Sequence, residues 1–387
     1  MSQLLLACIQ RSVSQEYRVG GRHIVFEDEM FYTHENTTLE SNGSDGTIKF
    51  TTWFPDVTLR LRKLYGVSKS SFLASVSQFQ GDFAAGEGKG GSLFLTTSDK
   101  KYILKTVKKN ERANLHSMMQ DYARYVIAHP ATLLPWFLGY YTLNVNEREV
   151  TVVIMPNLLP PGFKVHGRYD LKGSLINRAV GKAPEAGETL KDVDWLNRKR
   201  TANLSRVDEL AIVQQLRLDA AFLAQHNLMD QSLFLGVHRT SWVSRFRSFA
   251  HLLRCTAVGE QRHSPLRFHS FQGGLPSLYG DEIFYIGIID VLQDYDFSKK
   301  AENAIKRLRG SGGKSISEER EPNLQDFAIR HNQLHSAVAP QVYEARFVEF
   351  MKDHVFLRGA NNPDIGRSST SASEPSTSLT SPAKSCN

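Results

Sequence analysis

The chain has 387 residues, enough to bury a substantial core in one large domain or in two lobes. Its 47 Lys and Arg against 40 Asp and Glu give a net charge of +7, a mild excess that indicates anionic partners only where it clusters. Three scattered cysteines argue against a disulfide framework or a zinc site. No signal peptide, lipid-anchor motif or apolar run of roughly 18 residues is recognised, so any membrane contact is expected to be peripheral.

Strand and helix patterns then alternate along the chain. Ser98-Asp99-Lys100 is a hairpin signal between two apolar runs. Apolar residues recur every three or four positions over 208–228, which predicts a helix that Ser205 can cap. Strands dominate early and helices later, which indicates two lobes with a crevice between them. The expected strands are residues 92–96, 102–107, 150–155 and 284–289.

Three regions depart from this pattern. Residues 240–282 place arginines among Ser, Phe and Gly, and residues 310–335 open on a run of Gly and Ser. Both are expected to be inserted loops. Residues 357–387 are rich in Ser, Thr and Pro, which predicts a disordered tail.

A glycine-rich segment, Gly86 to Gly91, has GxGxxG spacing. A dinucleotide fold requires a helix after such glycines, whereas a strand follows here, as in kinases whose glycine loop covers ATP phosphates. The second strand then supplies Lys105, which can neutralise phosphate charge. The alternatives are a flexible surface loop and a lysine that points to water.

Two carboxylates follow apolar segments. Asp290 ends the run Tyr285 to Ile289, where it is either a Mg²⁺ ligand or a cap for the next segment. Asp230 follows the predicted helix and could face the same crevice, or could be an ordinary helix-terminal residue.

The run Tyr169 to Ser174 contains Asp-Leu-Lys-Gly-Ser, and Asn177-Arg178 follows it. With this run, the chain resembles the phosphatidylinositol phosphate kinase family over roughly residues 48–356, which leaves 1–47 as an N-terminal extension. Shorter segments similar to the family occur in the same order: Leu133-Leu134-Pro135, Asn157-Leu158-Leu159-Pro160, Met229-Asp230, Gly287-Ile288-Ile289-Asp290 and Ala339-Pro340.

The resemblance implies an α+β, two-lobed lipid kinase fold, with an antiparallel sheet in the N-terminal lobe and a mixed α/β C-terminal lobe. It also implies ATP and Mg²⁺ as cofactors, and Glu111 as a loosely matched ion-pair partner of Lys105. Gln231 replaces the family's usual tyrosine, which puts the packing beneath Asp230 in question. The implied site is Gly88, Gly91, Ser92, Lys105 and Asn157 for ATP, Asp290 for the metal, and Asp170, Lys172, Arg178 and Asp230 for catalysis.

The basic segment after Asp290 bears on the substrate. By the resemblance, Lys299 and Lys300 recognise the membrane and the headgroup phosphate, and Glu302 matches the acidic position of the 5-kinase type. Tyr295-Asp296 and nearby alanines instead resemble the 4-kinase type. We expect a phosphatidylinositol 4-phosphate 5-kinase that binds the cytoplasmic face of membranes, above all the plasma membrane. The alternatives are a phosphatidylinositol 5-phosphate 4-kinase and a non-catalytic membrane-binding pseudokinase.

Other classes fit less well. A protein kinase should show His-Arg-Asp, Asp-Phe-Gly and Ala-Pro-Glu, and none of these occurs. An RNA-binding module would want aromatic residues interleaved with a basic sheet face, a pattern that is not found, so no nucleic-acid partner is expected. Oligomeric state cannot be read from the sequence.

Overall fold

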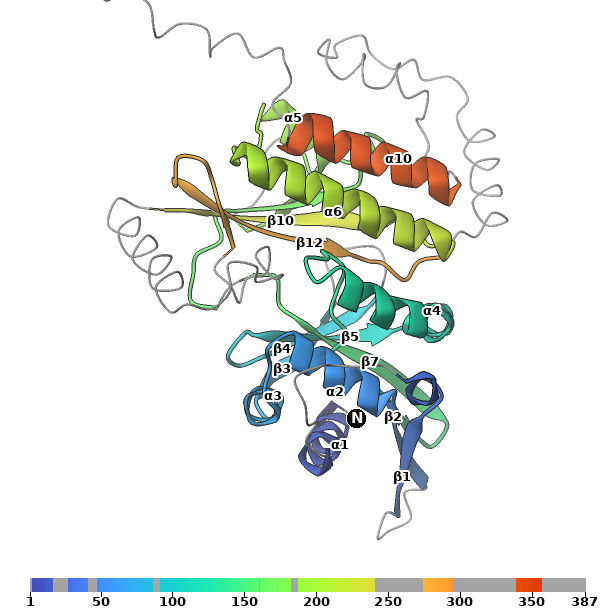
Figure 1. Ribbon diagram of the computed structural model, residues 1–387. Coiled ribbons are helices and arrows are strands. Elements are labelled where there is room, and N and C mark those ends of the chain that lie inside the picture. The colour runs from blue at the N-terminus through green and yellow to red at the C-terminus, as the bar shows by residue number, and fades with distance from the viewer. Residues whose placement is uncertain are drawn as a thin grey trace, which may run out of the picture.

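Two β-sheets organise the computed structural model, one in each of two lobes that lie one above the other in Figure 1. The first sheet has seven strands, all antiparallel to their neighbours. The second has five strands and is mixed, because β8 and β9 run parallel. This confirms the α+β, two-lobed kinase fold. The structure describes residues 2–16, 27–40, 47–85, 91–159, 161–181, 187–240, 274–294 and 339–356.

The first lobe is built on the sheet order β1-β2-β6-β7-β5-β4-β3. The predicted hairpin is present, since β4 and β5 pair directly across a turn. The strands are β1 (His34–Glu40), β2 (Thr47–Trp53), β3 (Phe79–Ala85), β4 (Leu93–Thr97), β5 (Tyr102–Val107), β6 (Gly139–Val145) and β7 (Arg148–Pro156). The helical segments are α1 (Ser2–Gln15), η1 (Asp28–Phe31), α2 (Pro55–Leu64), α3 (Lys69–Val76) and α4 (Lys109–Ala128).

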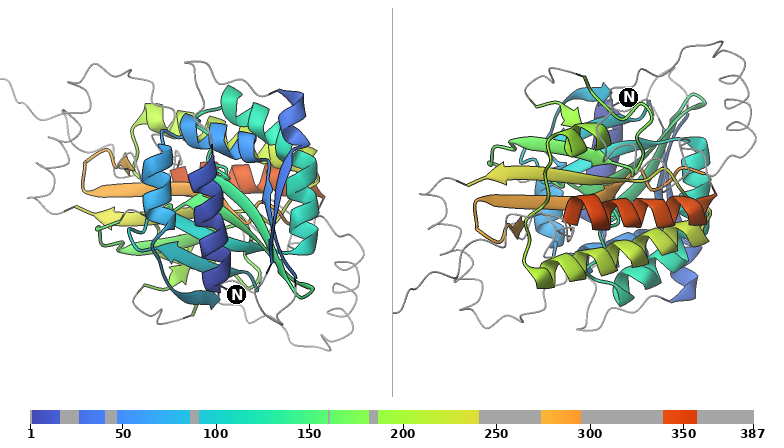
Figure 2. Two further views of the ribbon diagram at one scale, coloured as in Figure 1. Left: turned by 90° about the horizontal axis from the view of Figure 1, so that it is seen from below. Right: turned by 90° about the horizontal axis from the view of Figure 1, so that it is seen from above.

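Helix α1 covers part of the sheet face that points away from the second lobe, beside α3, as the left panel of Figure 2 shows. Its buried side chains are Leu5, Cys8, Ile9 and Val13, which recur every three or four residues along one helix face. Residues 1–47, expected as an extension ahead of the kinase domain, therefore supply a core helix and strand β1 to the first lobe.

The second lobe has the sheet order β11-β12-β10-β8-β9, and its helices α6 and α10 pack side by side (Figure 1). Ser205 caps α6 as expected, because its hydroxyl accepts the Asp208 N–H at 3.2 Å. The elements are β8 (Gly167–Leu171), β9 (Thr189–Leu190), α5 (Asp192–Asn197), α6 (Arg206–Gln225), β10 (Ser232–Arg239), β11 (Leu275–Pro276), β12 (Glu282–Ile289), α10 (Pro340–Phe350) and η3 (Met351–Phe356).

The expected inserted loops fall largely outside the described residues, at 241–273 and 295–338, as does the tail at 357–387. The described end of the first loop contains β11, which pairs with the start of β12. No helix in the described part of the chain is long and apolar enough to cross a membrane.

Candidate active site

A cavity of about 390 Å³ lies between the lobes, a volume typical of small-molecule sites. The first lobe contributes β4, β5 and β7, the second contributes β8, β10 and β12, and the segment 133–137 forms a further wall. Most of the lining is apolar. The predicted site residues that line it are Gly91, Ser92, Lys105, Asn157, Asp170 and Asp290.

Leu158 and Leu159 pack on the second sheet at positions where the strands carry glycines. A Cβ added to Gly287 would come within 2.6 Å of Leu158, and one added to Gly236 within 2.7 Å of Leu159. Asn157 holds this connection in place: its amide donates to the Lys100 carbonyl and its side-chain oxygen accepts the Leu159 N–H. Asn157 thus shapes the cavity wall through these contacts.

Lys105 and Asp290 meet at the cavity across the two lobes. The Lys105 Nζ lies 2.9 Å from the Asp290 Oδ1, and the lysine side chain is 11% exposed against 46% for the carboxylate. Asp290 has a φ of 59°, so the chain turns sharply as β12 ends. A cation and a carboxylate are therefore held at the point where a phosphate chain could enter.

Glu111 does not have the expected role as partner of Lys105. Its carboxylate instead accepts the Lys108 backbone N–H at 2.9 Å and the Gln293 side-chain amide at 2.9 Å. Glu111 is 2% exposed and sits in the first turn of α4, where a carboxylate satisfies N–H groups that lack a helical partner. A glutamate at this position fits either role, a helix cap or an ion-pair partner, so the residue type alone did not distinguish them.

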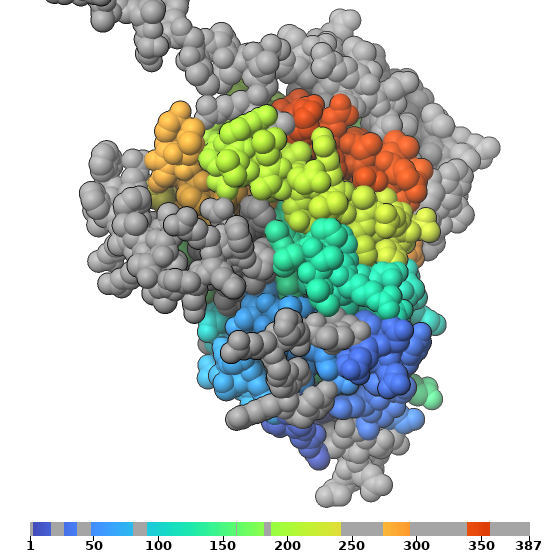
Figure 3. Space-filling view, in the orientation of Figure 1, coloured from blue at the N-terminus to red at the C-terminus, as the bar shows by residue number. Residues whose placement is uncertain are grey.

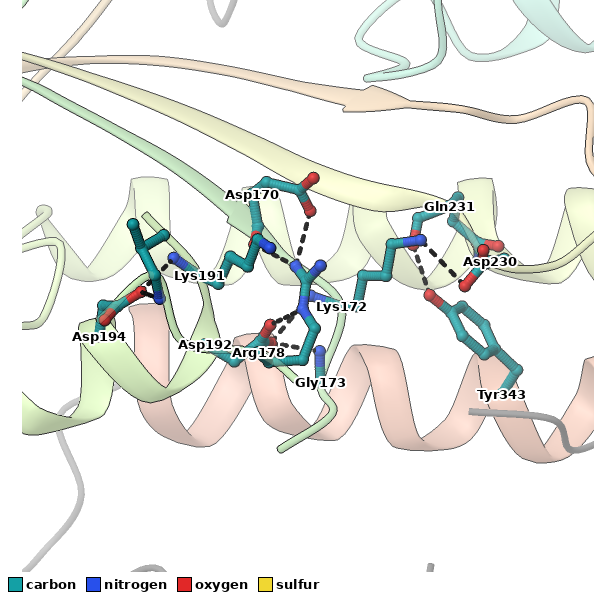
Figure 4. A network of polar contacts seen from close by, with 11 residues as sticks. Asp170, Lys172, Gly173, Arg178, Lys191, Asp192, Asp194, Asp230, Gln231 and Tyr343 are labelled. Atoms are coloured by element: carbon teal, nitrogen blue, oxygen red, sulfur yellow. Dashed lines mark hydrogen bonds and ion pairs between the residues drawn. The ribbon is translucent and has the colours of Figure 1, made fainter. Parts of the chain in front are cut away.

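A second pair, Lys172 and Asp230, lies at the same end of the second sheet. Their Nζ and Oδ1 atoms are 2.9 Å apart. Figure 4 shows the two side chains pointing toward each other. The antiparallel register pairs Ser232 with Ile289, so Asp230 before β10 and Asp290 after β12 leave neighbouring strands at one edge. The sheet therefore brings together two carboxylates that are 60 positions apart in the printed sequence.

Gln231, which stands where the family usually has a tyrosine, lies in a segment that is held by its backbone. Gln231 is buried, and its backbone carbonyl accepts a hydrogen bond from the Tyr343 hydroxyl on α10 (Figure 4). This contact uses the backbone, so it does not depend on the side chain at 231. The segment that carries Asp230 is consequently anchored from below.

Arg178 joins two further carboxylates beside this pair. Its Nε lies 2.7 Å from the Asp192 Oδ2, and its Nη2 lies 2.8 Å from the Asp170 Oδ1 (Figure 4). Burial alone would lower the pKa of Arg178, but the two carboxylates outweigh burial and raise it. The guanidinium is thus a permanent charge that fixes Asp170.

Asp192 was not found from the sequence. It is fully buried and accepts the backbone N–H groups of Lys172 at 2.8 Å and Gly173 at 2.7 Å, besides binding Arg178. Gly173 has a φ of 67°, and an added Cβ would meet Phe350 at 3.1 Å, so a glycine suits this turn. The signal that could have found Asp192 is its position at the start of a short helix, next to a lysine and a second aspartate.

Asp219 was missed as well. This buried carboxylate on α6 accepts hydrogen bonds from Tyr125 on α4 at 2.6 Å, from the Thr132 hydroxyl at 2.6 Å and from the Leu133 N–H at 2.7 Å. On the face seen in Figure 3, α4 of the first lobe lies directly against α6 of the second lobe. Asp219 therefore ties a first-lobe helix and a cavity wall to the second lobe.

The remaining site residues of the sequence prediction, Gly88, Lys299, Lys300 and Glu302, lie outside the described residues. Within the described ranges, no group of three His, Cys, Asp or Glu side chains could hold a metal ion by itself. Asp290 could supply one carboxylate ligand, and Mg²⁺ bound with a nucleotide commonly takes one or two carboxylates plus phosphate oxygens and water. The residues present fit that kind of site.

The lobes, the interlobe cavity and the paired charges define a kinase fold. Residues 82–354 match the family described as phosphatidylinositol-4-phosphate 5-kinase. The chain belongs to the phosphatidylinositol phosphate kinase family.

The relatives include a phosphatidylinositol phosphate kinase whose name gives no positional specificity and mammalian phosphatidylinositol 5-phosphate 4-kinases. A probable phosphatidylinositol phosphate kinase of Dictyostelium discoideum is 30% identical over 81% of this chain and 49% of its own length. The human phosphatidylinositol 5-phosphate 4-kinase type-2 alpha is 28% identical, over 82% of this chain and 80% of its own. The mouse type-2 beta protein is 27% identical over the same shares. The chain thus spans about half of the Dictyostelium protein and four-fifths of the mammalian ones.

Proposed function

We propose that the chain is an ATP-dependent lipid kinase that moves the γ-phosphoryl group of ATP to a hydroxyl of a phosphatidylinositol phosphate. The observation that carries this proposal is the pairing of Lys105 with Asp290 at the mouth of an apolar cavity between two lobes. Phosphoryl transfer is catalysed mainly by positioning and charge neutralisation, which suits such a set of fixed charges. Membership of the family supports the same reaction.

Each residue of the site would have a separate role in phosphoryl transfer. The apolar walls would hold the base, and Lys105 would bind the phosphates. Asp230 would accept the proton of the attacking lipid hydroxyl, whose oxygen bonds to the γ-phosphorus as the bond to the bridging oxygen of ADP breaks. Lys172, already paired with Asp230, would neutralise charge on the transferred group. Mg²⁺, when bound at Asp290 with the nucleotide, would supply further charge neutralisation.

For the lipid, we propose phosphatidylinositol 4-phosphate, phosphorylated at the 5-hydroxyl to give the 4,5-bisphosphate. Glu302 behind Lys299 and Lys300 supports this choice by its match to the 5-kinase type. The second candidate is phosphorylation of phosphatidylinositol 5-phosphate at the 4-hydroxyl, which the names of the mammalian relatives favour.

The membrane contact belongs to the same proposal. Lys299 and Lys300 lie in a segment that also carries Lys306, Arg307 and Arg309. Each basic residue near an anionic bilayer contributes about 1 kcal/mol, so the segment could dock the enzyme transiently on the cytoplasmic face of a membrane.

The test is turnover with labelled ATP and Mg²⁺ on vesicles that contain one monophosphorylated phosphatidylinositol at a time, followed by identification of the product isomer. Asp290→Asn serves as the inactive control. Wild type should prefer the 4-phosphate, and Glu302→Ala should gain relative activity on the 5-phosphate with ATP affinity little changed. Preference of wild type for the 5-phosphate supports the second candidate. No turnover on any lipid, with ATP and vesicle binding intact, supports the non-catalytic alternative.

A further inference from the structure

One wall of the cavity is held by a buried guanidinium from α2. Arg62 is 1% exposed, and its Nη1 donates to the Leu138 carbonyl at 2.8 Å. Leu138 directly follows Trp136 and Phe137, which line the cavity, and its own N–H donates to the Ile154 carbonyl at 2.8 Å. Arg62 therefore fixes the backbone immediately behind the lining residues.

The carboxylate of Glu16, just after α1, neutralises the charge of that guanidinium. The Glu16 Oε1 lies 2.6 Å from the Arg62 Nη2, and the Glu16 side chain is only 9% exposed. Lys69 binds the Ser14 carbonyl at 2.9 Å and the carbonyl of Glu16 itself, so Glu16, the residue that follows α1, is held at both its backbone and its side chain. Packing of α1 on the lobe thus places the Glu16 carboxylate against Arg62.

The same region packs against the wall from other directions. The ring of Phe72 on α3 lies 4.5 Å from the Arg62 guanidinium, and the Tyr65 ring packs at a tilt of 57° against Trp136, with ring centroids 5.1 Å apart. None of α1, α2 or α3 falls within the matched family residues, which begin at 82. The roles of these helices therefore do not follow from the family match.

We propose that α1 is a built-in positioning element for the nucleotide site: Glu16 holds Arg62, and Arg62 holds the Leu138 carbonyl and with it the cavity wall. Glu16 and Arg62 are positioning residues, since neither lines the cavity. An unpaired guanidinium in the core is strongly disfavoured, so loss of Glu16 would drive Arg62 toward water and release Leu138. The proposal rests on the proposed function, because it takes the ligand of this cavity to be ATP.

The experiment uses the full chain and separates positioning from stability. In Glu16→Gln, the melting temperature should fall and the KM for ATP should rise about tenfold, a coupling of the size that reaches between sites through packed side chains. In Glu16→Gln with Arg62→Met, an apolar side chain replaces the buried guanidinium, so most of the lost stability should return. The Leu138 carbonyl still lacks its donor there, so the KM for ATP should stay raised. Arg11→Gln, on the exposed face of α1, is the matched control and should match wild type.

Backbone hydrogen exchange over residues 133–139 provides a readout that does not depend on ATP. Exchange should accelerate in the double variant relative to wild type and Arg11→Gln. The proposal is overturned if the double variant has a wild-type KM for ATP, or if exchange in this segment is unchanged. Wild type that fails to bind ATP would instead contradict the proposed function, and the exchange result would still decide whether Glu16 and Arg62 hold the wall.

Discussion

Replacing Asp192 by asparagine tests the polar network beneath Lys172. The Asp192 Oδ1 accepts both backbone N–H groups, of Lys172 and Gly173, and the amide oxygen of asparagine can still do so. Its NH2 group then replaces the Oδ2 that faces the Arg178 Nε at 2.7 Å, so two donors point at each other. The variant therefore removes one buried charge-assisted contact and leaves the rest of the geometry in place.

The magnitude follows from the burial of this contact. Breaking a fully buried ion pair costs about 3–5 kcal/mol, and the lower value applies because Asp170 still partners Arg178. At about 2–4 °C per kcal/mol for a large domain, the melting temperature should fall by roughly 6–12 °C. Because the two facing donors would displace Arg178, which also fixes Asp170 in the cavity lining, kcat/KM for lipid phosphorylation should fall by about 10- to 100-fold.

Asp194→Asn is the matched control. Asp194 lies two residues further along α5, and its Oδ2 likewise accepts two backbone N–H groups, those of Val180 and Lys191, at 3.0 Å each. The amide oxygen of asparagine can replace it, so a loss of at most about 1 kcal/mol is expected. Thermal melting and lipid kinetics on both variants decide the matter. Equal losses in the two variants, or a change below twofold in kcat/KM for Asp192→Asn, would refute the reasoning.

Three further outcomes are expected. Lys105→Met should lower kcat/KM by at least about 100-fold while Lys101→Met does not, because only Lys105 faces the cavity; a loss below threefold would mark Lys105 as a surface lysine. Neutralising Lys299 and Lys300 together should weaken sedimentation with anionic vesicles, and wild-type binding should fall steeply with salt, whereas salt-independent binding contradicts the docking proposal. Burial lowers the pKa of His116 to about 4, so stability present above about pH 6.5 should be lost as pH falls through 4, by at most about 3 kcal/mol. His116→Phe should flatten that part of the stability–pH curve, and an unchanged curve would show that other groups govern it.

Periodicity predicted much of the fold. The strand at 150–155 is the centre of β7, and the helix expected over 208–228 is α6, with its start and end two or three residues earlier. These elements have one clear core face and a nearby cap, so local sequence contains the information. Helix α1 was not predicted, although Leu5, Ile9 and Val13 have helical spacing, because the apolar run at its start does not by itself indicate what it packs on.

A site residue could be predicted from the sequence only where a charged side chain directly follows an apolar strand. Asp290 follows an apolar strand, and the structure brings it to Lys105. Asp192 and Asp219 follow no such pattern. The partners of Asp219 include Tyr125 and Thr132, both more than 80 positions away, so no local spacing reports on its burial.

Buried charges around the cavity constrain how the elements of each lobe pack, and one of them also joins the two lobes. Arg62, Arg178 and Asp219 are each desolvated, and each has its partners on a different element of the fold. A packing that separated any one of them from its partners would leave an unpaired buried charge or acceptor, at a cost of several kcal/mol. Apolar contacts alone tolerate small slides between packed surfaces, whereas these hydrogen bonds do not. Asp219 provides the sharpest case, because it is held at once by α4 and by the wall segment, so a shift of either lobe would break a contact that water cannot replace.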